Sequence, residues 1–311
     1  MKLVFCGTPQ FAVPTLLALA RAKHEIALVV TQPDRASGRG LASAPPPVKV
    51  AAESLNIPTI QPEKIKNNPA FRLQLETIGP DAIIVVAYGR IIPKWMLELP
   101  RYGNINLHGS LLPKYRGAAP IQWAIASGES ETGVTTMLLN EGLDTGDMLL
   151  AHKVAILPDT TAPELFDTLS DVGAHLMVET LRRLEAGDLQ PASQDHAAAT
   201  HAPLLTRADG EIDFNRTAQQ IYDRWRGFQP WPGAFTHFRG KRMVIHRLRV
   251  HNEVESGLQP GAIIVNAGKF LVGCGGGSVL ELLEVQVEGK ARVTAAEFAR
   301  GYQVRNAGQL G

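Results

Sequence analysis

An amide, an imidazole and a carboxylate stand at positions from which they could form one site. Asn106 and His108 are two residues apart in an apolar run, and side chains at that spacing on a strand point to the same face. Asp144 lies between two glycines, where a tight loop can present a carboxylate without a bulky neighbour. These three groups are the ones that acyl transfer coupled to proton transfer requires.

Each of these residues also has an ordinary structural interpretation. Taken singly, Asn106, His108 and Asp144 are typical strand-end and turn residues, and a lone histidine beside apolar neighbours is more often structural. Together they occupy a strand that opens into a loop rich in glycine and proline, which is where open α/β sheets bind ligands. The combination therefore favours a functional site.

The segments that carry these residues resemble a known family. NLHGSLLPKYRGAAPI at 106–121 and GLDTGD at 142–147 are similar to the motifs of the folate-dependent formyltransferases, most closely those that act on methionyl-tRNA. Further similarity extends over nearly the whole chain, at FCGTP (5–9), TQPDR (31–35), VVAYG (85–89), GEID (210–213) and FQPWPG (228–233).

Apolar periodicity predicts an α/β architecture. A chain of 311 residues with 45% hydrophobic content is long enough for two domains. Strands alternating with helices in the first half predict a Rossmann-like parallel sheet. Short strands separated by glycine-containing turns predict a small barrel in the second half, which the resemblance identifies as OB-like. We expect a formyltransferase domain at 1–188, a linker at 189–206 and a tRNA-binding domain at 207–311.

The predicted elements follow from the same periodicity. In the first half we expect strands at 3–6, 26–30, 82–87 and 105–108, and helices at 14–22, 48–55, 118–126 and 163–185. In the second half we expect a helix at 217–228 and strands at 243–250, 261–265, 270–272 and 280–287.

The resemblance implies transfer of the formyl group of 10-formyltetrahydrofolate to the α-amino group of initiator methionyl-tRNA. An amine that attacks the formyl carbon creates an oxyanion, and one donor placed to bind it is typically worth about 3 kcal/mol. Asn106 and His108 could both donate. Asp144 could accept the amine proton, directly or through water, or could hold His108 in one tautomer, and the sequence leaves these roles open.

The resemblance also assigns binding residues by position. Backbone groups of two segments would form the folate pocket, and a loop from Asp34 to Lys49 would reach the acceptor end of the tRNA, where an arginine can bind phosphate or stack on a base. The expected folate-binding residues are Val86, Ala87, Tyr88, Gly89, Ser110, Leu111, Leu112 and Pro113, and the expected tRNA-binding residues of the loop are Arg35, Arg39 and Lys49.

Charge is concentrated in one part of the chain. The formal net charge is only +1, so any contact with RNA must be local. Residues 205–250 include nine basic residues and only four acidic ones. A charge run is usually a solvated surface. However, Arg247 and Arg249 alternate with apolar residues, which predicts a positive strip on one strand face and adds both to the expected tRNA contacts.

Several other kinds of protein do not fit the sequence. Cys6 and Cys274 have no ligand spacing, and His196 and His201 lack accompanying ligands, so neither a disulfide framework nor a metal site is expected. No apolar run has the length of a membrane helix, and the N-terminus has no signal-peptide pattern. We expect a monomer in the cytoplasm that needs no metal.

Two alternative functions remain open at this stage. A formyltransferase for an amino sugar or for glycinamide ribonucleotide would share Asn106, His108 and Asp144. The basic second half and the glycine-flanked Arg39 argue against it. A non-catalytic RNA-binding or folate-binding protein on the same scaffold would not need the three residues, yet all three are present.

Overall fold

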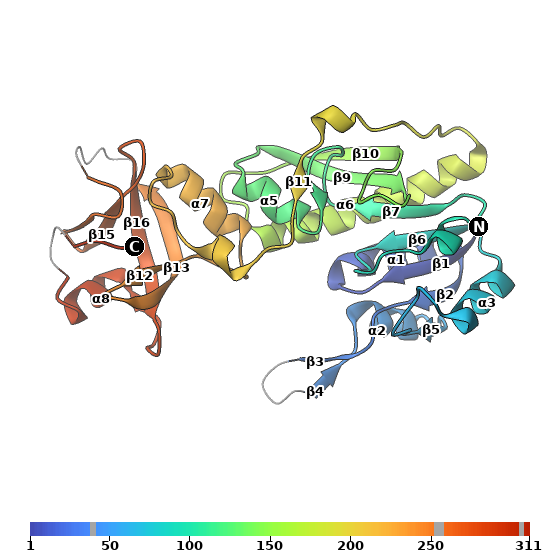
Figure 1. Cartoon of the computed structure of the whole chain (residues 1–311), viewed down its shortest axis with the longest axis horizontal. Helices are drawn as coiled ribbons and strands as arrows, with labels where there is room; N and C mark the ends of the chain where they lie inside the picture. Colours follow the sequence, from blue (N-terminus) through green and yellow to red (C-terminus); the bar gives the residue numbers. More distant parts are fainter. Residues whose placement is uncertain (38–41, 252–257, 305–307) are drawn as a thin grey trace. The chain divides into compact units, whose positions relative to one another are not determined.

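The computed structural model describes residues 1–37, 42–251, 258–304 and 308–311 (Figure 1). The chain forms two compact units. Unit 1 comprises Met1–Pro120, Glu131–Ala155 and Glu164–Pro203, and unit 2 comprises Ile121–Ser130, Ile156–Pro163 and Leu204–Gly311. Two short segments of unit 2, 121–130 and 156–163, therefore lie between segments of unit 1 in the sequence. The expected domains, 1–188 and 207–311, are each continuous in the sequence and do not include this exchange of segments.

Unit 1 is built on a seven-stranded sheet with the strand order β10-β9-β7-β6-β1-β2-β5. The strands from β7 to β5 are parallel to one another. β9 runs antiparallel to its neighbours β7 and β10, so β10 has the same direction as the parallel strands. Strands covered on both faces are apolar throughout, as in β6, where every residue is buried. The bounds are β1 Lys2–Gly7, β2 Glu25–Val30, β5 Thr59–Ile60, β6 Ala82–Val86, β7 Asn104–His108, β9 Glu131–Leu138 and β10 Met148–Ala155.

Helices pack on both faces of this sheet. On one face, Phe71 and Leu75 join a core cluster with Val4 and Ile83 from the central strands. On the other face, the backbone at Gly173 approaches Leu107 so closely that an added Cβ would lie 2.6 Å from its Cδ2. The helices of unit 1 are α1 Val13–Arg21, α2 Pro47–Ser54, α3 Pro69–Ile78, α4 Lys94–Leu97 and α6 Ala162–Ala186, together with η1 Gln10–Ala12 and η2 His196–Ala198.

The strand order reverses at β1. β2 pairs with one side of β1 and β6 with the other, so the chain builds the sheet outward in both directions from this strand. Open α/β sheets bind ligands outside the carboxyl ends of their strands at such a reversal. The carboxyl ends of β6 and the adjacent β7 are therefore the expected place for a site.

Two small additions border this end of the sheet. The predicted linker contains β11 His201–Ala202, which pairs in parallel with β8 Arg116–Gly117, and the residues up to Pro203 belong to unit 1. A hairpin of β3 Arg35–Ser37 and β4 Ala42–Ala44 projects from the loop before α2 (Figure 1).

Unit 2 contains an antiparallel sheet with the order β12-β13-β16-β15-β14, and β17 pairs with β16. The C-terminal residues form hydrogen bonds near both end strands of this order. Leu310 N donates to Gly261 O, just before β14, at 2.9 Å, and Gly311 N donates to His237 O in β12 at 3.2 Å. The strands are β12 Phe235–Phe238, β13 Lys241–His251, β14 Ile263–Asn266, β15 Lys269–Gly273, β16 Val279–Val287 and β17 Val293–Thr294.

Helices complete the core of unit 2. α7 Ala218–Gly227 packs against α5 Pro120–Ala126, where the rings of Trp123 and Phe228 meet edge to face at 5.3 Å. α8 Ala295–Gly301 places Phe298 among the strand side chains, and η3 Arg207–Gly210 precedes α7. The predicted fold class, a Rossmann-like parallel-sheet domain followed by a small OB-like barrel domain, is confirmed. Unit 1 contains the largely parallel sheet and unit 2 the antiparallel sheet.

Candidate active site

Asn106 and His108 lie at the carboxyl end of β7, on the same face as Asn104. The strand is fixed on that face by the Asn104 amide, whose Nδ2 donates to Met96 O in α4 at 2.8 Å. β7 also pairs with β6 on one side and with β9 on the other, which places Thr135 opposite His108. Sheet position therefore fixes the direction in which the two predicted site residues point.

The two ring nitrogens of His108 have different partners. Nε2 lies 2.9 Å from the Tyr115 carbonyl oxygen, and Nδ1 lies 3.7 Å from Asp144 Oδ2. Because a carbonyl can only accept, Nε2 must carry a proton, so in the neutral ring Nδ1 has a free lone pair. The His108 side chain is 6% accessible. A proton that reached Nδ1 would produce an imidazolium beside a carboxylate, and the carboxylate would stabilise it.

Asp144 is held in the loop between β9 and β10 by a main-chain contact. Its Oδ2 accepts a hydrogen bond from Gly117 N at 2.9 Å, and its φ of +51° is in the left-handed region. Gly117 has a φ of +125°, and an added Cβ would lie 2.5 Å from Ala202 O. Only glycine fits there, and its N–H fixes the carboxylate beside His108.

Asn106 is half-buried and differs from its neighbours in its hydrogen bonding. The Asn104 amide and the His108 ring both bond to protein groups, whereas no partner for the Asn106 amide is found among the residues that the structure describes. Its two N–H donors are therefore available to an oxygen of a substrate.

The first predicted folate-binding segment offers backbone groups rather than side chains. Val86 ends β6, Ala87 is exposed with a φ of +46°, and Tyr88 is buried in the core. Burial raises the pKa of the Tyr88 phenol far above its usual value. The Tyr88 carbonyl accepts from Thr8 Oγ1 at 3.1 Å and from Gln32 Nε2 at 2.9 Å, and the backbone of Gly89 is exposed.

The second segment, Ser110 to Pro113, is a tightly bonded loop. Ser110 Oγ donates to Lys114 O at 2.6 Å, and the Ser110 carbonyl accepts from Thr135 Oγ1 at 2.7 Å. Leu112 N donates to the same Thr135 hydroxyl at 3.2 Å. Ser110 and Leu112 therefore build the loop, whereas Leu111 is only partly buried and keeps accessible side-chain surface.

The predicted tRNA-binding residues of unit 1 lie around the β3–β4 hairpin. Lys49 Nζ lies 2.9 Å from Asp34 Oδ2, and Arg35 donates to Gln32 Oε1 at 2.5 Å. The hydrogen bonds from Gln61 and Lys49 lower the pKa of the Asp34 carboxyl. Arg39 lies outside the described residues.

Acidic residues face the predicted positive strip of unit 2. Arg247 lies 3.2 Å from Glu284 and Arg249 lies 2.7 Å from Glu281, both on the adjacent strand β16. The glutamates of β16 partly neutralise the predicted positive strip, which the sequence of one strand alone could not indicate. Both arginines remain largely exposed, with side chains 60% and 59% accessible.

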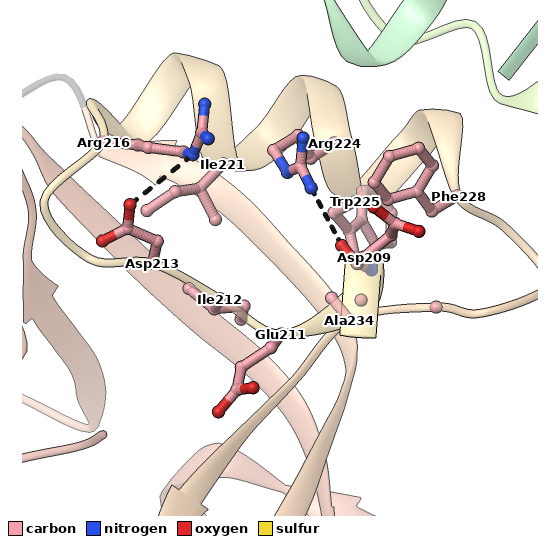
Figure 2. Close-up of a pocket in the computed structure, with 12 residues that line it drawn as sticks. Asp209, Glu211, Ile212, Asp213, Arg216, Ile221, Arg224, Trp225, Phe228 and Ala234 are labelled. Atoms are coloured by element: carbon pink, nitrogen blue, oxygen red, sulfur yellow. Dashed lines mark hydrogen bonds and ion pairs between the residues drawn. The ribbon is translucent and has the colours of Figure 1, made fainter. Parts of the chain in front are cut away.

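A hollow in unit 2 brings together the GEID and FQPWPG motifs (Figure 2). Arg224 donates to the Asp209 carbonyl at 3.0 Å, and Arg216 lies 3.7 Å from Asp213. The cavity measures about 10 Å³, which is room for about one water molecule. These motifs therefore pack against α7 within unit 2, around a space too small for a substrate.

No group of three or more histidine, cysteine, aspartate or glutamate residues within the described ranges could hold a metal ion. In the same part of the chain, no helix has the length and apolar character needed to cross a membrane.

Family comparison agrees with this architecture. The model described as "Formyl transferase" matches residues 1–181, and "Formyl transferase, C-terminal domain" matches residues 204–303. A methionyl-tRNA formyltransferase of Acidobacterium capsulatum is 61% identical over 311 residues, and the match covers 100% of this chain and 100% of that protein. One of Koribacter versatilis is 58% identical, covering 100% of this chain and 99% of that protein.

Among solved structures, the fold is similar to that of an N-formyltransferase from Helicobacter canadensis in complex with folinic acid and dTDP-3-aminofucose. The TM-score is 0.66, the identity is 18%, and the match covers 91% of this chain and 98% of that one. At this identity the likeness concerns the fold alone.

Proposed function

Because the chain belongs to the methionyl-tRNA formyltransferase family and so formylates methionyl-tRNA, we propose that its donor is 10-formyltetrahydrofolate and that Asn106, His108 and Asp144 form its catalytic centre. The acceptor is the α-amino group of initiator methionyl-tRNA, and the product is N-formylmethionyl-tRNA for translation initiation.

The proposed reaction forms a bond from the amine nitrogen to the formyl carbon and breaks the bond from that carbon to N10 of the folate. Attack leaves negative charge on the formyl oxygen. The Asn106 amide, which has no partner among the residues that the structure describes, supplies donors for it. His108 Nε2 is engaged by the Tyr115 carbonyl, so we assign the histidine to proton transfer through Nδ1. Nδ1 takes the proton that the amine loses and returns it to N10, while Asp144 stabilises the intermediate imidazolium.

The remaining predicted residues keep binding roles in this proposal. Backbone groups of Val86, Ala87, Tyr88 and Gly89 and the loop of Ser110, Leu111, Leu112 and Pro113 bind the folate. On the tRNA, Arg35, Arg39 and Lys49 contact the acceptor end, and Arg247 and Arg249 contact backbone phosphate.

The observation that carries the assignment is the 61% identity over the full length of a methionyl-tRNA formyltransferase. The proteins that act on sugars enter only through a fold match at 18% identity, which does not favour the amino-sugar alternative. His108 and Asp144 lie 3.7 Å apart, and Asn106 is on the same strand as His108, which gives no support to a non-catalytic binding protein.

The test uses three acceptors with 10-formyltetrahydrofolate: initiator methionyl-tRNA, a nucleotide-linked amino sugar and glycinamide ribonucleotide. We expect turnover only with the tRNA. Asp144→Asn keeps the shape of the side chain but removes its charge, and should lower kcat by about a hundredfold or more with little change in KM. Preferred use of the amino sugar would refute the assignment of methionyl-tRNA as the acceptor. A normal kcat in Asp144→Asn would refute the proposed catalytic centre.

A further inference from the structure

The segment of residues 193–202, called the strap below, follows α6 and borders the proposed active site within unit 1. It pairs with β8 through His201 and Ala202. Arg116 N also donates to Thr200 O at 2.9 Å, and Ala119 N donates to Ala202 O at 3.2 Å. The strap, which belongs to the predicted linker, is therefore hydrogen-bonded along its length to the loop that follows His108.

Gln194 is the most constrained side chain of the strap. Its Oε1 accepts two hydrogen bonds from Arg116, at 3.0 Å from Nε and 2.6 Å from a terminal guanidinium nitrogen. Its Nε2 donates to Asp144 O at 2.9 Å and to Gly146 O at 2.7 Å. A guanidinium only donates and a carbonyl only accepts, so the orientation of the amide is fixed. Gln194 is 5% exposed and uses all of its hydrogen-bonding capacity.

These bonds act on the backbone that carries the carboxylate. Asp144 has a φ of +51°, a conformation that a residue with a side chain adopts only when its surroundings hold it there. Gln194 binds the carbonyl of Asp144 itself and that of Gly146, so it fixes the loop on both sides of residue 145. Arg116, which is also 5% exposed, holds the other end of the Gln194 amide through its two hydrogen bonds to Oε1.

Thr200 holds the other partner of His108 in the same way. The Tyr115 N–H donates to Thr200 Oγ1 at 2.8 Å, and the Tyr115 carbonyl accepts from His108 Nε2 at 2.9 Å. Tyr115 also has a positive φ, of +59°. One segment, at Gln194 and Thr200, thus holds both groups that contact the imidazole.

We propose that Gln194 is a positioning residue for formyl transfer, which sets the Asp144 carboxylate against His108 Nδ1, and that Thr200 does the same for the Tyr115 carbonyl. The inference rests on the proposed function, because it concerns the geometry of the same site. A displacement of about 1 Å in a catalytic group can cost about a hundredfold in rate. The strap therefore acts on kcat without contacting either substrate.

The experiment compares Gln194→Ala and Gln194→Glu with the wild-type full-length enzyme. The glutamate keeps an acceptor for Arg116 but replaces the two donors with an oxygen facing the carbonyls of Asp144 and Gly146. Both variants should lower kcat per folded molecule by about tenfold to a hundredfold, with KM for folate and tRNA within about twofold. Thr200→Val should also lower kcat, and Thr200→Ser, which keeps the hydroxyl, should restore it.

Ser193→Ala is the matched control. Ser193 donates to Asp147 Oδ1 at 3.1 Å, so this bond joins the same two segments at an exposed position that does not reach Asp144. The variant should keep wild-type kcat. The thermal midpoint of each variant is measured in parallel, since a purely structural role would lower the midpoint and leave kcat per folded molecule unchanged.

The outcomes separate this inference from the proposed function. If Asp144→Asn loses turnover while the Gln194 and Thr200→Val variants keep it, the positioning role is refuted and the site stands. If Asp144→Asn itself keeps turnover, the proposed site is refuted. Should Gln194→Ala fail to fold, Gln194→Glu and the Thr200 pair still decide the question, because each keeps most of the packing at its position.

Discussion

Opposite charges meet in two regions of this protein, with different surroundings. At the site of unit 1, His108 and Asp144 are 6% and 12% accessible, and each is bonded to main chain. On the sheet of unit 2, the Arg247 and Glu284 side chains are 60% and 24% accessible, and the contact between the two charges joins one side chain to the other. Burial and main-chain contacts fix the geometry of the first pair. Solvent screens the second pair, so this pair contributes little to the stability of the fold.

The difference explains how similar residue types can have different uses. A fixed carboxylate can orient a proton-transfer group because neither partner can turn away. Exposed arginines that pair with glutamates can exchange those partners for phosphate at little cost. We therefore expect catalysis to depend on the first region and affinity to depend on the second.

The largest effect is expected at the site. Asn106→Ala should lower kcat by about a hundredfold, because a donor to the oxyanion is lost. Its thermal midpoint should remain near that of the wild type, because the amide has no partner among the described protein groups. His108→Ala should lower kcat at least as much and should also lower the midpoint, since it removes a buried ring and its bond to Tyr115. Equal midpoints for the two variants would contradict this account of the site.

A smaller effect is expected on the exposed strip, in opposite directions for the two partners. Arg247→Ala should weaken binding of methionyl-tRNA several-fold and lower the salt slope by about 1, if the arginine contacts one phosphate. Glu284→Gln should tighten binding, because it releases Arg247 and Arg292, which both pair with that carboxylate. Binding is measured at two salt concentrations. A change of the same sign in both variants would show that the strip does not face RNA.

The smallest effect concerns pH. The hydrogen bond from Arg292, followed by that from Arg247, lowers the pKa of the Glu284 carboxyl below its ordinary value of 4.5. A carboxyl with a lowered pKa stabilises the fold above its unfolded pKa and loses that contribution as pH falls through its folded pKa. The thermal midpoint of the wild type should thus slightly exceed that of Glu284→Gln at pH 7. The two midpoints should converge below about pH 4.5. If the difference between the two thermal midpoints stayed constant down to pH 3, the ion pairs of Glu284 could not be the source of that difference.

Local patterns in the sequence were sufficient for the main elements. Apolar periodicity placed β1, β2, β6, β7 and α6 to within one or two residues, because these elements bury continuous apolar surface. α3 and α8 were not predicted, although their ends carry recognisable signals. Asn68 accepts from Phe71 N at the start of α3, and Thr294 forms a capping box with Glu297 at the start of α8. Those two helices could therefore have been found.

The sequence by itself determined the residues of the candidate site and the face on which two of them lie. The spacing of Asn106 and His108 is enough, since strand geometry acts over neighbouring residues. Only the tertiary structure decided what holds these groups in place. Gln194 lies 50 residues from Asp144 in the chain, and Glu284 lies 37 residues from Arg247. Partners so distant in sequence are set by strand order, register and loop packing, which no local pattern encodes.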